Sequence, residues 1–252
     1  MGKGIETVMK NQSLSKAMNL QMGDRLALVG GGGKTSILYT LAKENIYSRG
    51  LYTTSTKMYD PSSGTHPFHR LLLNWQEEDC PLPLQKIESC FIASGRMKGT
   101  KPKVIGLSNN RINNWKSTEA WPILVIEADG AAGRPVKAPN EGEPVIPERI
   151  NRVIGCIGLD ALGKKIEPPW VHRPELFRER FCRTGQQMID PEILMELIRH
   201  PEGLFKNSPV DSTKTVIFNK LDCLDSPFEI EKMLEDFKRD CPSHQFLALS
   251  LI

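Results

Sequence analysis

Apolar residues in this chain gather in short runs that alternate with segments of helical periodicity. Residues 25–29 (RLALV) form an apolar run typical of a buried strand. In residues 34–48, Ile37, Leu38 and Leu41 recur at the spacing of one helix face. The same patterns predict strands at 50–54, 89–94, 103–108, 122–130, 152–159, 214–222 and 245–252, and helices at 13–20, 174–181, 191–200 and 226–240.

The alternation of predicted strands and helices along the chain favours one fold class. Alternating β and α units predict an α/β fold with a mostly parallel sheet, helices on both faces and inserted loops. No internal repeat or linker divides the chain, so we expect a single domain over residues 1–252. Within it, residues 1–20 form an N-terminal extension and residues 130–150 form a Pro-rich loop suited to a substrate.

Composition excludes several classes of partner. With 33 basic and 30 acidic residues the net charge is +3, which is too balanced to predict nucleic-acid binding. Apolar runs are too short for a membrane span and the first twenty residues too polar for a signal peptide, so we expect a cytoplasmic protein without a membrane partner. The six cysteines lack CxxC spacing, which argues against a zinc ribbon or a redox pair.

The stretch LVGGGGKTS at residues 28–36 joins the first predicted strand to the first long helix. Turn amides and a helix N-terminus in this order form a cradle for phosphate, which predicts a P-loop NTPase-like fold. The usual G-x-x-x-x-G-K-[ST] pattern would have a glycine at Leu28, so we infer a shortened loop that begins at Gly30. A flexible glycine turn with a surface lysine is the alternative. The predicted phosphate contacts are Gly30, Gly31, Gly32, Gly33, Lys34, Thr35 and Ser36.

Two carboxylates follow the most apolar strand, in VIEADG. Ligands in open parallel sheets bind at the carboxyl ends of the strands, where Glu127 and Asp129 are expected. Asp129 is predicted to hold Mg²⁺ together with the Thr35 hydroxyl, or to orient an attacking water. A turn aspartate ahead of Gly130 is the alternative interpretation.

The strand near residue 218 ends in FNKLD, which matches the N-K-x-D arrangement of GTPases. A carboxylate at Asp222 can accept two hydrogen bonds from guanine, whereas adenine offers no such donor pair. Lys220 would lie along the base and Asn219 would tie this loop to neighbouring segments. Ser250 ends the last strand where GTPases carry another serine beside the base. GTP is favoured over ATP, although both remain open.

Six segments in this order carry a family resemblance: LVGGGGKTS, YTTSTKM, VIEADGAAGRPVKAPNEGEPVIP, VHRPELF, HPEGLFKNSP and FNKLD. The chain resembles the YqeC family, the selenium-dependent hydroxylase accessory proteins, from about residue 20 to its C-terminus. The resemblance implies a cytoplasmic role in selenium or molybdenum cofactor assembly, with a selenium-dependent molybdenum hydroxylase or its cofactor as partner. The shortened glycine loop is usual in that family.

The resemblance adds candidates after the second strand and in the Pro-rich loop. Thr54 and Thr56 are expected to contact phosphate or Mg²⁺, and Lys57 to neutralise transferring charge. The loop carries the charged residues Arg134, Lys137, Glu141 and Glu143, and is followed later by His172 and Arg173. A stiff charged loop beside Asp129 is a good place for a second substrate, and His172 is a candidate proton carrier or metal ligand.

Together these patterns predict an accessory protein that binds GTP or ATP with Mg²⁺ and hydrolyses or transfers phosphate during cofactor maturation. Lys34, Lys57 and Asp129 are the candidate catalytic residues. Two alternatives remain: a carrier that binds a nucleotide-bearing cofactor without hydrolysis, and a kinase-type phosphotransferase.

Overall fold

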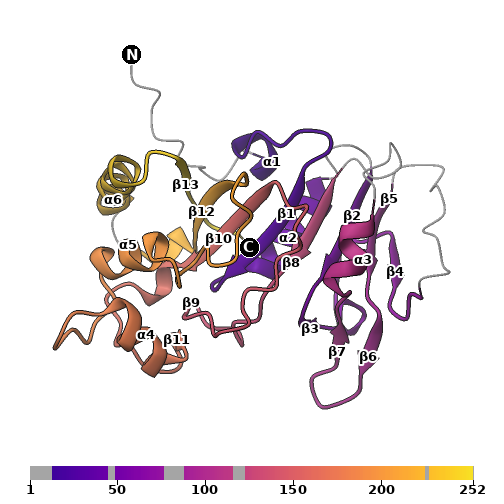
Figure 1. Cartoon of the computed structure of the whole chain (residues 1–252), viewed down its shortest axis with the longest axis horizontal. Coiled ribbons are helices and arrows are strands. Elements are labelled where there is room, and N and C mark those ends of the chain that lie inside the picture. Colours follow the sequence, from indigo (N-terminus) through magenta and orange to yellow (C-terminus); the bar gives the residue numbers. More distant parts are fainter. Residues whose placement is uncertain (1–12, 45–48, 77–87, 116–122, 225–226, 252) are drawn as a thin grey trace.

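The computed structural model describes residues 13–44, 49–76, 88–115, 123–224 and 227–251, and its centre is a parallel sheet (Figure 1). The eight strands stand in the order β13 (His244–Leu249), β12 (Thr213–Asn219), β10 (Arg152–Gly158), β1 (Arg25–Gly30), β8 (Leu124–Glu127), β2 (Arg49–Thr54), β5 (Glu88–Ile92) and β4 (Arg70–Leu72). All neighbours in this sheet pair in parallel, which confirms the predicted α/β architecture.

Helices cover both faces of the sheet because successive strand side chains point to opposite sides. On β1, Leu26 and Leu28 pack in the core of one face, while Ala27 and Val29 pack in the core of the other. The first face is covered by α1 (Leu14–Ala17) and α2 (Lys34–Glu44). The second is covered by α3 (Asn109–Asn114), α4 (Pro174–Phe181), α5 (Pro191–Arg199) and α6 (Pro227–Asp240).

Two small sheets extend from the lower edge of the central sheet as seen in Figure 1. One is antiparallel and contains β3 (Lys57–Tyr59), β7 (Lys103–Ile105) and β6 (Gly95–Met97), and we name it the β7 lobe. The other pairs β9 (Val136–Lys137) with β11 (Val171–His172), and together with α4 it forms the α4 lobe. Short 3-10 helices lie at Pro61–Ser63, Leu159–Ala161 and Leu221–Cys223.

The sequence predictions match the central sheet closely. Leu28 lies inside β1, as the shortened-loop interpretation required, and α4 has the predicted bounds. The pattern missed α3, β3, β4, β6, β9 and β11, of which β9 lies inside the predicted Pro-rich loop. The strands among them have only two or three residues, too few to show a periodicity. Residues 1–12 of the predicted extension and Cys80 lie outside the described residues.

We predict that Phe218→Ala destabilises the fold by about 3–5 kcal/mol, since it leaves a cavity in a packed core. Phe218 is fully buried on β12, and its ring centroid lies 5.6 Å from that of Phe237 on α6. Thermal and urea unfolding measure the loss. Val210→Ala is the control, because Val210 is 97% exposed and its truncation should change stability little. Equal stability of the two variants would contradict this account of the core.

Candidate functional site

The carboxyl ends of four neighbouring strands meet at one edge of the central sheet. In the order β12, β10, β1 and β8 these strands are adjacent and parallel, so the residues that follow them are brought together. The glycine loop follows β1, Asp129 follows β8, Asp160 follows β10 and Lys220 follows β12. Open parallel sheets bind their ligands at such an edge.

The glycine loop is a tight turn that leaves no room for side chains. It runs through residues 31–33 between β1 and α2, and the Gly32 N–H donates to the Arg134 carbonyl at 3.0 Å. Gly32 and Gly33 have φ angles of +74° and +133°, which disfavour any residue with a Cβ. A Cβ at Gly32 would overlap the backbone of Gly158, and one at Gly33 would overlap the side-chain amide of Asn219.

The first turn of α2 presents donors for an anion. Its first i→i−4 hydrogen bond runs from the Ile37 N–H to the Gly33 carbonyl at 2.9 Å, so the amides of residues 34–36 precede the helical hydrogen-bond ladder. In the same turn the Thr35 hydroxyl donates to Glu127 Oε2 at 2.8 Å. Thus an anion-directed helix N-terminus and a hydroxyl–carboxylate pair lie side by side.

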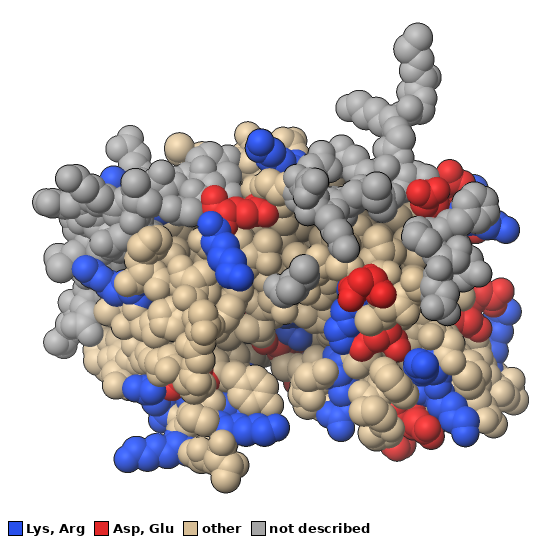
Figure 2. All heavy atoms as spheres, turned by 180° about the vertical axis from the view of Figure 1, so that it is seen from behind, with Lys and Arg blue, Asp and Glu red and all other residues tan. Residues whose placement is uncertain are grey.

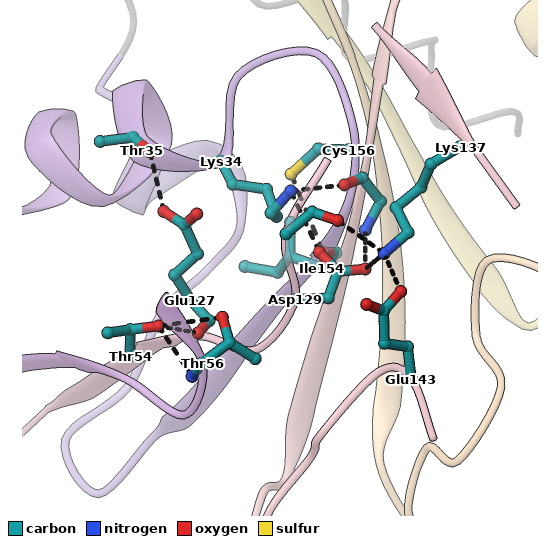
Figure 3. Close-up of polar contacts among 12 residues, drawn as sticks. Lys34, Thr35, Thr54, Thr56, Glu127, Asp129, Lys137, Glu143, Ile154 and Cys156 are labelled. Atoms are coloured by element: carbon teal, nitrogen blue, oxygen red, sulfur yellow. Dashed lines mark hydrogen bonds and ion pairs between the residues drawn. The ribbon is translucent and has the colours of Figure 1, made fainter. Parts of the chain in front are cut away.

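Asp129 is buried between two lysines (Figure 3). Its Oδ1 lies 3.0 Å from Lys34 Nζ and its Oδ2 lies 3.1 Å from Lys137 Nζ, while the Gly30 N–H donates to Oδ2 at 3.0 Å. Burial alone would lower the pKa of Lys34, but the charges of Asp129 and Glu127 outweigh it and raise the pKa above its usual value. Lys34 therefore stays charged inside the fold.

The ion-pair network continues into the α4 lobe. Lys137 Nζ also contacts Glu143 Oε2 at 2.6 Å, and Arg173 donates to both oxygens of Glu143 at 2.8 and 3.0 Å. Burial would raise the pKa of Glu143, but the hydrogen bonds from Arg173 and Lys137 lower it to about 2. Burial and the neighbouring cations Arg173, Lys137 and Arg134 lower the pKa of His172 to about 4, so its imidazole is neutral at pH 7.

The predicted base motif is assembled at the end of β12. Asn219 donates from Nδ2 to the Gly32 carbonyl at 2.9 Å, and its Oδ1 accepts from the Leu251 N–H at 3.1 Å. It thus ties the glycine loop to the end of the sheet, as the sequence suggested. The Asp222 N–H donates to the Ser250 hydroxyl at 2.9 Å, which brings these two predicted base-side residues together. Lys220 Nζ forms an ion pair with Asp160 Oδ2 at 2.5 Å.

A cavity of about 490 Å³ opens above the glycine loop, between the two lobes. Its floor contains Gly33, Lys34, Thr35 and Ser36. The β7 lobe contributes Lys57, Met58, Tyr59 and Lys103, and the opposite wall contributes Arg134, Glu143 and His172. Seen from behind, the surface is hollowed at its lower edge, with Lys and Arg side chains on both sides (Figure 2).

A larger cavity of about 650 Å³ lies elsewhere, between the end of α4, α5 and α6. Several of its charged side chains pair with one another, so it offers less free charge to a ligand. These pairs are Arg183–Glu192 at 3.1 Å, Arg199–Glu196 at 2.7 Å and Arg239–Asp236 at 2.9 Å. The cavity at the glycine loop is therefore the stronger candidate site.

Two of the predicted residues, Thr54 and Thr56, form hydrogen bonds at the end of β8 instead of lining the cavity. The Thr54 hydroxyl donates to the Glu127 carbonyl at 2.8 Å, and the Thr56 N–H donates to the Thr54 hydroxyl at 3.1 Å. Lys57 lies in the cavity wall, whereas Glu141 is exposed.

Two charged residues of the site were not predicted from the sequence. Asp160 was missed, although its position directly after a strand was a usable signal. Lys103 was also missed, and the sequence carries no signal for it because β7 belongs to a separate small sheet.

The oxygen atoms at the loop fit Mg²⁺. A hydroxyl and a carboxylate are the hard donors that Mg²⁺ takes from a protein when phosphates and waters complete its shell. Thr35 and Glu127 are such a pair, whereas the oxygens of the nearby Asp129 are paired with Lys34 and Lys137. Among the described residues, no group of three or more His, Cys, Asp or Glu side chains could hold a metal ion by itself. A bound ion would thus depend on the phosphates as co-ligands.

The parallel sheet, the glycine turn and the helix that follows it define an α/β fold of the P-loop type. A family model described as YqeC protein matches residues 26–175. The chain is also 30% identical over 224 residues to the uncharacterized protein YqeC of Escherichia coli (strain K12), covering 85% of this chain and 82% of that protein. The chain therefore belongs to the YqeC family, which confirms the resemblance.

No solved structure matches this chain. Within the part of the chain that the structure describes, none of the helices has the length and apolar character needed to cross a membrane.

The low pKa of Glu143 predicts a pH dependence of stability. A carboxylate whose folded-state pKa lies near 2 instead of 4.5 adds stability that is complete above about pH 4.5 and is lost as the pH falls toward 2. Glu143→Gln should therefore lower the melting temperature at pH 7, and the difference from the wild type should narrow between pH 4.5 and 2. Glu141→Gln, at an exposed position of the same loop, is the control. A constant difference across this range would contradict the assigned ion pairs.

Proposed function

We propose that this protein binds a nucleoside triphosphate with Mg²⁺ at the glycine loop. The observation that carries the proposal is the contact between the Thr35 hydroxyl and Glu127 Oε2, 2.8 Å apart, in the first turn of a helix that follows a side-chain-free turn. The first turn of α2 thus offers amides that suit phosphate, and the Thr35 hydroxyl beside Glu127 of β8 offers oxygens that suit a cation. A glycine turn that served only to reverse the chain direction would need neither the helix amides nor the hydroxyl–carboxylate pair.

Different residues of the site would bind the phosphates and the metal ion. Glycine-loop and α2 amides bind phosphate oxygens, and Lys34 adds a charge that Asp129 keeps in place. Thr35 and Glu127 would hold Mg²⁺, with Asp129 close behind them, and the ion would neutralise charge on the phosphates. Burial raises the pKa of Glu127, which makes this carboxyl responsive to the arrival of a cation. Lys57, at the cavity wall, can balance charge on a transferring group.

Guanine is the base that the end of β12 supports. Asp222 is exposed in the middle of a short 3-10 helix, and its backbone N–H donates to the Ser250 hydroxyl. A carboxylate there can accept from the two donors of guanine. Asn219 links the same segment to Gly32, so the base contact and the phosphate contact share one scaffold.

We further propose that nucleotide turnover accompanies selenium or molybdenum cofactor assembly in the cytoplasm. Support for this comes from the family resemblance, which implies a selenium-dependent molybdenum hydroxylase or its cofactor as partner. Phosphate release, measured with and without that apo-hydroxylase, separates a hydrolase from a carrier that binds without turnover. Phosphate found on an added acceptor would identify a kinase-type transferase.

Lys34→Met should weaken binding of Mg-GTP and Mg-ATP about 10- to 100-fold, because it removes a charge-assisted contact to phosphate. Isothermal titration calorimetry measures the affinity, and circular dichroism checks the fold. Lys43→Met is the matched control, since Lys43 is exposed in the last turn of the same helix and should bind normally. If wild-type protein with Mg²⁺ shows no saturable binding of either triphosphate, the proposed function is wrong.

Asp222→Asn should weaken GTP relative to xanthosine triphosphate. An amide offers a donor where guanine needs acceptors, so the ratio of the two dissociation constants should shift toward xanthosine. Competition binding with both nucleotides measures this ratio. Asp211→Asn changes another exposed aspartate, ahead of β12, and should leave the ratio unchanged. An unaltered ratio in Asp222→Asn would remove the guanine assignment and leave the phosphate site intact.

A further inference from the structure

The cavity above the glycine loop carries more positive charge than its carboxylates balance. Lys34 is paired with Asp129 and Lys220 with Asp160. The other cations of the cavity wall, Lys57, Lys103 and Arg134, have no carboxylate within ion-pair distance among the described residues. The two carboxylates that line it are already engaged, Glu127 by Thr35 and Glu143 by Lys137 and Arg173.

The backbone of Arg134 is hydrogen-bonded to the glycine loop. Its carbonyl accepts from the Gly32 N–H at 3.0 Å, and its own N–H donates to the Ala131 carbonyl at 3.0 Å. The next carbonyl, that of Pro135, accepts from the Gly158 N–H at 2.9 Å. Because this backbone segment is held by hydrogen bonds, the Arg134 side chain loses less conformational entropy when it binds an anion. Its planar guanidinium can donate two parallel hydrogen bonds to two oxygens of a phosphate group.

His172 adds a neutral hydrogen-bonding group to the same wall. Its carbonyl accepts from the Ala138 N–H at 3.1 Å, in the pairing of β11 with β9. The charged groups around its ring are Arg134, Lys137, Arg173 and Glu143. Lys137 and Arg173 are held by Glu143, whereas Arg134 is not, so Arg134 is the cation that remains available beside the imidazole.

We propose that Arg134 and His172 form a second anion subsite, which binds a phosphate-ester substrate beside the nucleotide. Lys57 and Lys103 face it from the β7 lobe and attract the same anion. The glycine loop and Lys34 bind the phosphates of the nucleotide. The two ligands therefore share one cavity and contact different walls of it. This inference rests on the proposed function only for the identity of the first ligand.

The test follows the ring signals of His172 by nuclear magnetic resonance, with inorganic phosphate as the probe. Phosphate is titrated into full-length protein saturated with Mg²⁺ and a non-hydrolysable GTP or ATP analogue, and also into nucleotide-free protein. We expect a saturable shift of the His172 signals, and a rise of its pKa above about 4, because a bound anion favours the imidazolium. His172→Gln assigns the signals among the five histidines.

Three variants make the outcome specific. Arg134→Ala should weaken the phosphate response about tenfold or more, and Arg134→Lys should restore it only in part, since lysine keeps the charge without the fork. Arg183→Ala removes the same charge from an 82% exposed side chain outside this cavity and should leave the response unchanged. Circular dichroism verifies that each variant folds.

Two results would overturn the subsite. One is the absence of any saturable His172 shift in both forms of the protein. The other is a shift that Lys34→Met abolishes and Arg134→Ala does not, which would place phosphate on the glycine loop alone. Failure of nucleotide binding is a separate result. In that case the nucleotide-free titration still decides, because an Arg134-dependent shift supports the subsite and an Arg134-independent shift refutes it.

Discussion

The burial of Asp129 between Lys34 and Lys137 is the constraint on which the site depends. A carboxylate removed from water is costly unless its charge is met, and here two ammonium groups at 3.0 and 3.1 Å and the Gly30 amide meet it. Lys34 begins α2 directly after the glycine loop, and Lys137 belongs to β9 in the α4 lobe. The one carboxylate therefore joins the glycine loop to the Pro-rich loop, and removing either lysine would leave it with a single ammonium partner.

Around this centre, the parallel sheet brings together residues that are far apart in the chain. Because all strands run in one direction, their carboxyl ends share an edge, and Asn219 can reach the Gly32 carbonyl across 187 positions of sequence. The absence of side chains in the loop is what allows this approach, since a Cβ at Gly33 would overlap the Asn219 amide. The same geometry explains why a loop shorter than the usual pattern can still present helix amides to a cavity. In this chain the cavity lies between two lobes that are not part of the central sheet.

Periodicity recovered most of the central sheet, together with α4 and β7, but not the short strands. Apart from the three-residue edge strand β4, the strands of the central sheet have apolar runs because both of their faces are buried, and such runs are visible in sequence. The missed strands β6, β9 and β11 have two or three residues, and their places are set by partners distant in the chain, such as His172 with Lys137. The sequence named the wall residues Lys57, Arg134, Glu143 and His172, whereas Lys103 and Tyr59 carried no sign of a role.

The sequence by itself determined the α/β class and the glycine turn between the first strand and the first long helix, because apolar runs and turn residues are local properties. The turn was expected to begin at Gly30, but Gly30 is the last residue of β1 and the turn starts one residue later. Tertiary structure alone decided which charges neutralise one another. Asp129 was expected beside the metal and lies between two lysines, while Glu127 takes the contact with Thr35. Strand alternation does not distinguish Glu127 at the end of β8 from Asp129 just after it, since they stand two positions apart. Their different partners follow from which neighbouring segments pack against each one, which no local pattern contains.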